Sequence, residues 1–287
     1  MDRTMHINSA KVESNVQASD WPKISVVTVF YNPGPLLEKT ILSVFEQNYP
    51  NLDYVLIDDC STDGSELVAK KYSDRVRYWR NSSNLGIYGA MNEGIKVADG
   101  QWLNFLNSGD IFYSKKVLRN VARQIKLSPQ TDFIYGKFRL VDPEDGLQLV
   151  KGDKVSRRDW CFRTAICHQT VFARNNLFSE IGPYDATMRI TADYDWFVKY
   201  FSRQKIHPLF IDDILVDFLL DGASFRHRLV GLRERLGIVK KNYSNFIYAL
   251  NLLNYIYRKS KMILIYRFYH TRLFKFYRKI KYRNKGL

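Results

Sequence analysis

The stretch Trp102–Phe112, WLNFLNSGDIF, starts as an apolar and aromatic run and ends in small polar residues. The run predicts a buried strand, and the residues from Asn107 to Asp110 predict the turn that follows it. A carboxylate at the point where a core strand opens into a loop lies at the carboxyl edge of a sheet, where open α/β folds bind ligands. Asp110 is therefore the first candidate for a functional acid. The alternative interpretation is a turn aspartate that caps the next helix, near Ser114.

Strand-like and helix-like segments alternate before this stretch. The pattern of apolar residues predicts strands at 23–31, 54–57 and 76–79, and helices at 36–47, after 61–63 and at about 88–98. This alternation predicts an α/β fold with a mainly parallel sheet, flanking helices and right-handed crossovers. The first strand is not followed by GxGxxG, and the chain contains no Gly-Lys-Ser/Thr phosphate loop. Both absences argue against a nicotinamide-binding or P-loop protein.

The positive charge of the chain is concentrated near its C-terminus. The formal net charge is +15 over 287 residues. Residues 223–287 contain 17 Lys and Arg and one acid, whereas residues 1–222 contain 27 basic and 28 acidic residues. A hydrophobic content of 46% with 25% charged residues is typical of a globular protein. We therefore expect a near-neutral catalytic or binding body at 23–222 and a basic tail at 223–287.

The remaining features concern the compartment. The three cysteines, Cys60, Cys161 and Cys167, form no CxxC pair, which argues against a zinc site or a disulfide framework and favours a reducing compartment. Residues 1–22 lack the apolar core of a signal peptide and are predicted to be a flexible arm. No apolar run approaches the roughly 18–20 residues that a membrane span needs. We expect a cytoplasmic protein, or one that rests on the cytoplasmic face of a membrane.

Six segments, taken in order from Lys23 to about Asp221, resemble family 2 glycosyltransferases of the GT-A fold. They are ISVVTVFYN at 24–32, YVLIDDCSTDGS at 54–65, NLGIYGAMNEGI at 84–95, GQWLNFLNSGD at 100–110, CHQTVF at 167–172 and ITADYDWF at 190–197. The resemblance extends to bacterial polysaccharide and O-antigen glycosyltransferases. It implies a Rossmann-like GT-A catalytic domain at 23–222, followed by a basic, aromatic helical extension.

The resemblance assigns the nucleotide-binding residues. It implies that Tyr31 stacks on the base, that Asp59 accepts the imide N–H of uracil or thymine, and that the backbone at Val29 assists. Asn84 would shape a loop over the donor. Asp58 is expected to be structural, tying down the loop through Ser61. The alternative interpretation is that Tyr31 packs in the core.

The resemblance also assigns a metal site. Asp110 matches the last acid of the family's Asp-x-Asp signature, whose first acid is replaced here by Ser108. One carboxylate together with diphosphate oxygens and water can hold Mg²⁺ or Mn²⁺. The substitution weakens the case for metal dependence, and Ser108 could contact the ribose instead.

Asp193 corresponds to the general base of the family, which takes the proton from the acceptor hydroxyl. It is predicted to open a helix, and a helix N-terminus favours an ionised carboxylate. The alternative is a helix-capping role. His168 falls where family members often keep a histidine near the donor pyrophosphate, although an isolated histidine beside a strand can also be a satisfied core residue. Asp195 is expected to be structural or to face the acceptor.

The resemblance therefore implies an inverting glycosyltransferase that moves a sugar from a UDP- or dTDP-linked donor to a hydroxyl of a saccharide or lipid-linked acceptor. The chain lacks both the Gln-x-x-Arg-Trp motif and the membrane spans of the processive synthases, so we expect single transfers in cell-surface polysaccharide synthesis. The basic aromatic tail is predicted to bind an anionic membrane surface; it could also simply pack on the catalytic domain. Two other classes stay open, a non-catalytic sugar-nucleotide binder and, less favoured, a nucleic-acid-binding protein that uses the tail. We expect no nucleic-acid partner.

Overall fold

A computed structural model describes residues 20–81, 83–143, 146–156, 166–220 and 227–268 of the chain. The predicted flexible arm lies outside the described residues up to position 19. Its last residues are part of the folded body, because Trp21 packs edge-on against Tyr49 and the Tyr49 hydroxyl donates a hydrogen bond to the Pro22 carbonyl.

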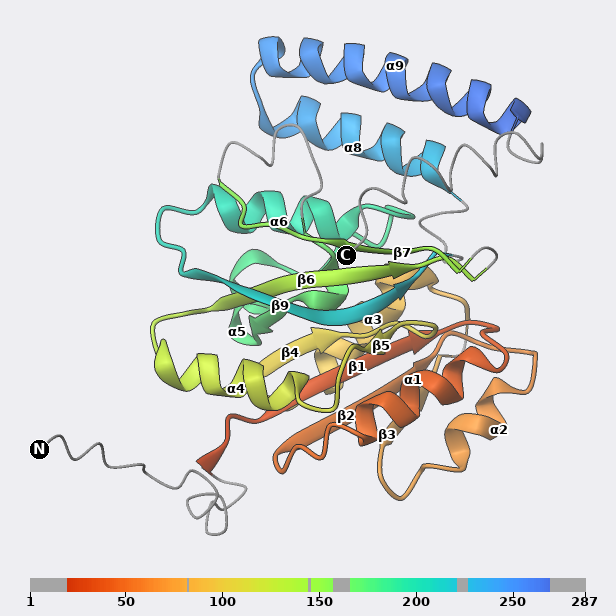
Figure 1. Ribbon diagram of the computed structural model, residues 1–287, viewed down its shortest axis with the longest axis vertical. Helices are drawn as coiled ribbons and strands as arrows, with labels where there is room; N and C mark the ends of the chain where they lie inside the picture. The colour runs from red at the N-terminus through yellow and green to blue at the C-terminus, as the bar shows by residue number, and fades with distance from the viewer. Residues whose placement is uncertain (1–19, 82, 144–145, 157–165, 221–226, 269–287) are drawn as a thin grey trace, which may run out of the picture.

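The N-terminal half alternates strands and helices as predicted (Figure 1). Its elements are β1 (Ile24–Phe30), α1 (Leu36–Phe45), β2 (Leu52–Asp58), α2 (Ser65–Lys70), β3 (Arg77–Arg80), α3 (Gly86–Val97) and β4 (Trp102–Phe105). Strand β1 pairs in parallel with β2 and with β4, and β2 pairs in parallel with β3. All seven residues of β1 are buried, because helices cover both faces of the sheet at this position.

The second half extends the same sheet with mixed pairing. Its elements are β5 (Ile111–Phe112), α4 (Val117–Leu127), β6 (Phe133–Val141), β7 (Gln148–Lys151), the 3₁₀ turn η5 (His168–Thr170), β8 (Phe172–Arg174), α5 (Asn176–Ile181), α6 (Ala192–Ser202) and β9 (Pro208–Leu219). The described strands run in the order β3-β2-β1-β4-β8-β6-β9-β5, with β7 beside β6. Strand β9 is parallel to β6, whereas β8 is antiparallel to both of its neighbours. The expected α/β fold with a mainly parallel sheet is confirmed, with antiparallel additions that the sequence pattern did not predict.

Two apolar cores separate the sheet from its helices. Side chains of α1, α2 and α4 fill the core on one face, and side chains of α3, α5 and α6 fill the core on the other. Helix α3 lies so close to β1 that a β-carbon on Gly94 would come within 2.5 Å of Val27. The close approach packs α3 tightly against β1, and the N-terminus of α3 is part of the site described below.

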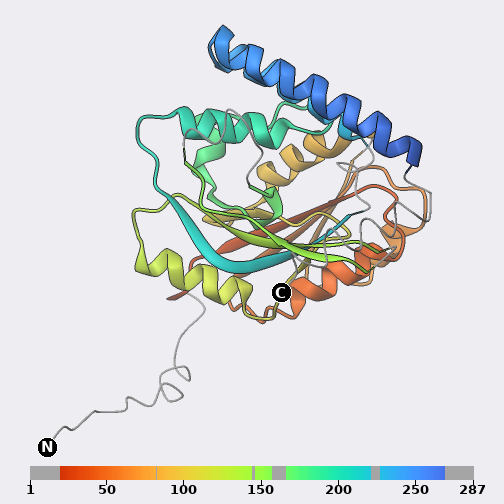
Figure 2. The same cartoon turned by 45° about the horizontal axis from the view of Figure 1, so that its top comes forward.

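The C-terminal extension is helical, as predicted. Helix α8 (Arg228–Asn242) packs against α6, and α9 (Asn245–Phe268) packs against α8 as the outermost layer (Figures 1 and 2). Two apolar runs of this extension, FIYALNLLNYIY at 246–257 and MILIYRFY at 262–269, belong largely to the single helix α9. The basic run at 272–283 lies outside the described residues. Across the described part of the chain, no helix combines the length and apolarity needed to cross a bilayer.

Candidate active site

The candidate residues gather at the carboxyl edge of β1, β2 and β4. The amide of Asp59 donates a hydrogen bond to the Phe30 carbonyl at 2.9 Å, which joins the ends of β2 and β1. The amide of Ser108 donates to the Val29 carbonyl at 3.3 Å, so the turn after β4 is held against the same strand. Gly109 completes this turn at φ +100°, a conformation that side chains rarely adopt. The expected juxtaposition of Val29, Tyr31, Asp59 and Ser108 is therefore present.

The carboxylate of Asp59 anchors the start of α3. Its Oδ1 accepts hydrogen bonds from the Asn81 side chain at 2.8 Å and from the Leu85 amide at 2.9 Å, and its Oδ2 accepts one from the Gly86 amide at 2.9 Å. The residue is only 4% exposed. A carboxylate offers about four acceptor positions, so one position on Oδ2 remains for a ligand donor. Asp59 is thus a structural residue as well as a candidate base reader.

The neighbours of Asp59 are arranged as follows. Tyr31 is 53% exposed, so the alternative that it belongs to the core is wrong. Asp58 is buried, and its Oδ1 accepts a hydrogen bond from the Ser61 amide at 2.7 Å, which confirms its structural role. Asn84 is exposed, and its Oδ1 accepts a hydrogen bond from the Gly86 amide at 3.0 Å. Asn84 therefore shapes the turn that leads into α3, beside the Asp59 carboxylate.

Asp110 is buried, with 6% of its surface exposed, and its carboxylate faces protein donors. Oδ2 accepts a hydrogen bond from the Gln169 side chain at 2.7 Å, and Oδ1 accepts one from the Leu219 amide at 3.0 Å. Burial raises the pKa of Asp110 to about 7, against the lowering effect of these two hydrogen bonds and of nearby His168. The alternative that Asp110 caps the next helix is wrong, because its side chain contacts η5 and the end of β9 instead.

The fit of this site to a divalent cation can be judged from its donors. Among the residues that the structure describes, no three His, Cys, Asp or Glu side chains cluster as metal ligands. Each Asp110 oxygen accepts one protein hydrogen bond and keeps a second acceptor position. The protein therefore offers one carboxylate to a cation, an arrangement that Mg²⁺ tolerates where substrate phosphates supply further ligands.

Asp193 lies in the first turn of α6, as predicted. Its Oδ1 accepts hydrogen bonds at 2.9 Å from the Tyr88 hydroxyl and from the Tyr194 amide. Its Oδ2 lies 3.2 Å from Nδ1 of His168. The side chain is 18% exposed, so the carboxylate is held on both oxygens and still reaches solvent. Asp195, two residues on, is buried and pairs with Lys199 at 2.7 Å, which is a structural contact.

His168 connects the two acids. Its Nε2 lies 3.1 Å from the Asn107 side-chain nitrogen, while Nδ1 faces Asp193. The tautomer with the proton on Nδ1 satisfies both contacts, because Nδ1–H then donates to Asp193 and Nε2 accepts from Asn107. In this arrangement Oδ1 of Asn107 is buried and has no hydrogen-bond partner among the described residues. An acceptor of this kind, at the turn that holds Ser108, is suited to a donor group of a bound ligand.

Four residues of the site were not singled out from the sequence. Asn81 and Tyr88 hold Asp59 and Asp193, and Asn107 and Gln169 contact His168 and Asp110. Asn107 and Gln169 are next to predicted site residues in the sequence, and this adjacency could have suggested them. Tyr88 gave no such signal, because its contact with Asp193 spans 105 positions of the chain.

The comparisons with known proteins agree with this geometry. The profile of the family described as "Glycosyl transferase family 2" matches residues 25–168, which include β1 to β4 and extend to His168. The chain belongs to glycosyl transferase family 2. This confirms the resemblance seen in the sequence, and it makes the protein a nucleotide-sugar-dependent glycosyltransferase.

Relatives similar in sequence include bacterial glycosyltransferases. A "PGL/p-HBAD biosynthesis glycosyltransferase" of Mycobacterium bovis is 28% identical over 201 residues, covering 69% of this chain and 77% of the relative. An uncharacterised glycosyltransferase of Rickettsia felis is 27% identical over 239 residues, covering 80% of this chain but only 39% of the relative.

Solved structures share the fold at lower identity. Residues 1–349 of S. aureus TarS in complex with UDP align with a TM-score of 0.62 at 18% identity, covering 88% of this chain and 73% of that one. The mannosyltransferase PcManGT of Pyrobaculum calidifontis, in complex with GDP-Man and Mn²⁺, aligns with a TM-score of 0.59 at 17% identity, covering 78% and 65%. The nucleotides bound in these two structures have different bases, so the shared fold does not determine which donor this enzyme uses.

Proposed function

We propose that this enzyme transfers a sugar, with inversion, from a UDP- or dTDP-linked donor to an acceptor hydroxyl, with Asp193 as the general base. The observation that carries the proposal is the placement of the Asp193 carboxylate. It is oriented by three contacts, lies at a helix N-terminus, and reaches solvent beside the edge of the sheet where the candidate donor residues gather.

The proposed reaction is a single in-line displacement. Oδ2 of Asp193 accepts the proton of the acceptor hydroxyl as that oxygen bonds to the anomeric carbon and the nucleoside diphosphate departs. The hydrogen bonds from the Tyr88 hydroxyl and the Tyr194 amide occupy Oδ1, whereas Oδ2 has one contact, from His168, and keeps a second acceptor position for the acceptor hydroxyl. The displacement forms no covalent intermediate with the enzyme. The residues of this chain contribute to catalysis by holding the base and the acceptor hydroxyl in a fixed geometry.

On the donor side, the exposed ring of Tyr31 would stack on the base and the remaining acceptor position of Asp59 would accept the imide N–H. Ser108, at the turn after β4, would contact the ribose or the diphosphate. His168 and the unpartnered Asn107 oxygen lie between these residues and Asp193, which supports a role for them near the pyrophosphate.

A divalent cation, Mg²⁺ or Mn²⁺, would be held by Asp110 together with the diphosphate of the donor. When bound, it would neutralise charge on the leaving nucleoside diphosphate. The Mn²⁺ in the PcManGT complex is consistent with this assignment but belongs to that protein.

The acceptor is proposed from the relatives and from the tail. The relative from M. bovis is named for PGL/p-HBAD biosynthesis, which supports a role in cell-envelope glycoconjugate synthesis with a saccharide or lipid-linked acceptor. Helix α9 exposes large apolar side chains in a chain segment of strongly positive charge. We place the enzyme on the inner face of the cell membrane, bound peripherally to anionic lipid.

Two variants test the reaction. The donor is first identified by thermal stabilisation with a panel of nucleotide sugars, since a bound donor raises stability by mass action. Donor hydrolysis is then measured, in which water replaces the acceptor. Asp193→Asn should lower hydrolysis by roughly 10²–10⁴-fold and keep donor affinity, whereas Asp110→Asn should weaken donor binding in the presence of Mg²⁺ or Mn²⁺.

The matched control is Asp213→Asn, which removes an exposed acid of β9 outside the site. It should hydrolyse donor at the wild-type rate. Hydrolysis by Asp193→Asn near that rate would remove Asp193 from its role, and no hydrolysis by any form of the protein would favour a non-catalytic sugar-nucleotide binder.

A further inference from the structure

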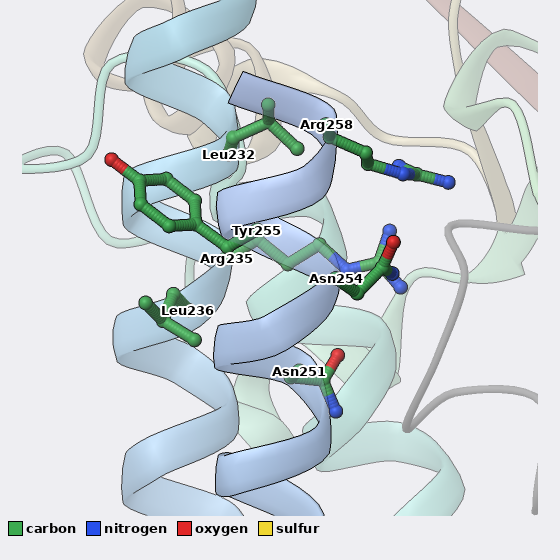
Figure 3. A pocket seen from close by; sticks show the side chains of 7 residues that line it. All are labelled: Leu232, Arg235, Leu236, Asn251, Asn254, Tyr255 and Arg258. Atoms are coloured by element: carbon green, nitrogen blue, oxygen red, sulfur yellow. The ribbon is translucent and has the colours of Figure 1, made fainter. Parts of the chain in front are cut away.

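A small cleft between α8 and α9 is lined by seven side chains, none of them acidic. Two are arginines, Arg235 of α8 and Arg258 of α9, and two are the amide side chains Asn251 and Asn254 (Figure 3). The heads of Arg235, Asn254 and Arg258 lie on the same side of α9 in this view. The acid next in sequence, Glu234, is engaged elsewhere, accepting hydrogen bonds from the amides of Ile190 and Thr191.

Arg235 is an unusual residue in this cleft. It is 8% exposed, and its guanidinium lies over the ring of Tyr194, 4.9 Å from the centroid. Its Nη2 is buried and has no hydrogen-bond partner among the described residues. A buried, unpaired guanidinium nitrogen is costly, and like charges that share a site destabilise each other. Burial and the charge of Arg258 both lower the pKa of Arg235. An anion bound in the cleft would accept a hydrogen bond from Nη2 of Arg235 and would reduce the repulsion between the two arginines.

We infer that the cleft between α8 and α9 binds a phosphate group, with Arg235 and Arg258 as its cationic ligands and Asn254 as a neutral donor. Planar guanidinium groups are the side chains that match phosphate oxygens in pairs. Asn254 is half-buried and Arg258 is exposed, so a small anion has access from solvent. Leu232 and Leu236 form the apolar walls of the cleft.

The position of the cleft relates it to two other features. Tyr194, under the guanidinium of Arg235, directly follows Asp193 in α6. On α9, Asn254 and Arg258 each follow a highly exposed apolar residue, Leu253 and Tyr257. One residue is about 100° of helical rotation, so the phosphate site lies next to the exposed apolar side chains of Leu253 and Tyr257. The phosphate group can therefore come from a free anion or from a lipid headgroup.

The test is a binding measurement on the full chain and does not depend on transferase activity. Inorganic phosphate is titrated by calorimetry, and vesicles of phosphatidylcholine doped with phosphatidic acid are titrated in a second arm. Arg258→Gln should weaken the phosphate-dependent binding by about tenfold or more, as expected for a lost charged hydrogen bond. Arg233→Gln is the matched control, because it removes an exposed arginine of α8 that does not line the cleft.

The arms separate the two sources. Saturable binding of inorganic phosphate that Arg258→Gln weakens supports a site for the free anion, and variant-sensitive binding confined to phosphatidic acid vesicles supports a lipid headgroup. Arg235→Lys should weaken binding in the same arm, and Arg258→Gln keeps the test valid if that variant does not fold. Phosphate bound equally by Arg258→Gln and Arg233→Gln, or no saturable binding in either arm, overturns the inference.

Discussion

The hydroxyl of Tyr88 lies 2.9 Å from Oδ1 of Asp193 and 2.7 Å from the Ile190 carbonyl. Tyr88 belongs to the first turn of α3, whose leading amides hold the carboxylate of Asp59. One helix therefore connects the candidate base reader at its N-terminus with the candidate general base through a side chain in the same turn. A displacement of α3 on donor binding would therefore change the position of the Tyr88 hydroxyl relative to the Asp193 carboxylate.

Tyr88→Phe should slow the reaction and keep donor affinity. The hydroxyl donates a hydrogen bond to Oδ1 of the Asp193 carboxylate and helps to orient it. Without this hydrogen bond, we expect donor hydrolysis to fall by about tenfold, the scale of one lost hydrogen bond to a charged group. The control is Tyr72→Phe, which loses a hydroxyl that donates to Glu38, away from the site. Donor hydrolysis by Tyr88→Phe at the wild-type rate would contradict the assignment.

The stability of the metal-free protein should depend on Asp110. Its pKa is about 7 in the folded protein and 3.8 by reference, so the folded state binds a proton that the unfolded state releases between these values. The contribution of Asp110 to the free energy of unfolding is therefore fully present below about pH 4 and is lost as pH rises through 7. In total this contribution is on the order of 4 kcal/mol.

Chemical denaturation at several pH values measures this effect. Other acids titrate over the same range, so the quantity to compare is the difference between wild type and Asp110→Asn. As pH rises from 4 to 8, we expect the free energy of unfolding of Asp110→Asn to increase relative to that of the wild type. A difference that is constant over this range would show that Asp110 is ionised without cost in the folded protein.

Cys60 adopts a backbone conformation that suits glycine better. Its φ is +73°, and it follows Asp58, the last residue of β2, and Asp59. Left-handed backbone costs a side-chain-bearing residue about 1–2 kcal/mol, against the roughly 0.5–1 kcal/mol that a glycine loses in entropy. Cys60→Gly should therefore be more stable than Cys60→Ala by up to about 1 kcal/mol in thermal unfolding. Both variants lack the thiol, and a less stable glycine variant would contradict the prediction.

The choice of base can be tested by competition. A carboxylate that accepts an imide N–H suits uracil or thymine, and Asp59 has one acceptor position left after its three protein contacts. We expect UDP and dTDP to bind more tightly than GDP in calorimetric titrations. The TarS and PcManGT complexes show that the fold itself accommodates both UDP and GDP-Man, so tighter binding of GDP would refute only the role given to Asp59.

The sequence was sufficient to predict the parallel half of the sheet and the edge at which the site lies. β1 and β4 are continuous apolar runs that end in polar turns, and this pattern is local. The antiparallel pairing of β8 with β4 and β6 depends on contacts between distant segments, which no local pattern encodes. The same distinction applies within the site. Asp110 and Asp193 were found from motifs, whereas the donors that hold them, Gln169 and Tyr88, come from other elements and are known only from the structure.

The last prediction concerns α9 and the membrane. Phe246, Leu250, Leu253 and Tyr257 follow one another at spacings of four, three and four residues, which places them on one face of the helix, and all four are exposed. Helix α8 covers another face of α9, so this apolar row is left uncovered among the described residues. The surrounding segment carries 17 basic residues and one acid. An apolar row within a basic segment suits the headgroup region of an anionic bilayer.

Replacing Phe246 and Leu253 by Ser in one variant should reduce co-sedimentation with anionic liposomes by more than about tenfold, since burying each such side chain is worth about 1.5–3 kcal/mol. Leu67→Ser is the control, because Leu67 is similarly exposed, at 61% against 65% for Leu253, but lies on α2. Binding should also need anionic lipid and weaken with salt. Equal sedimentation of the double variant and the control would mean that the exposed row of α9 packs on something other than lipid.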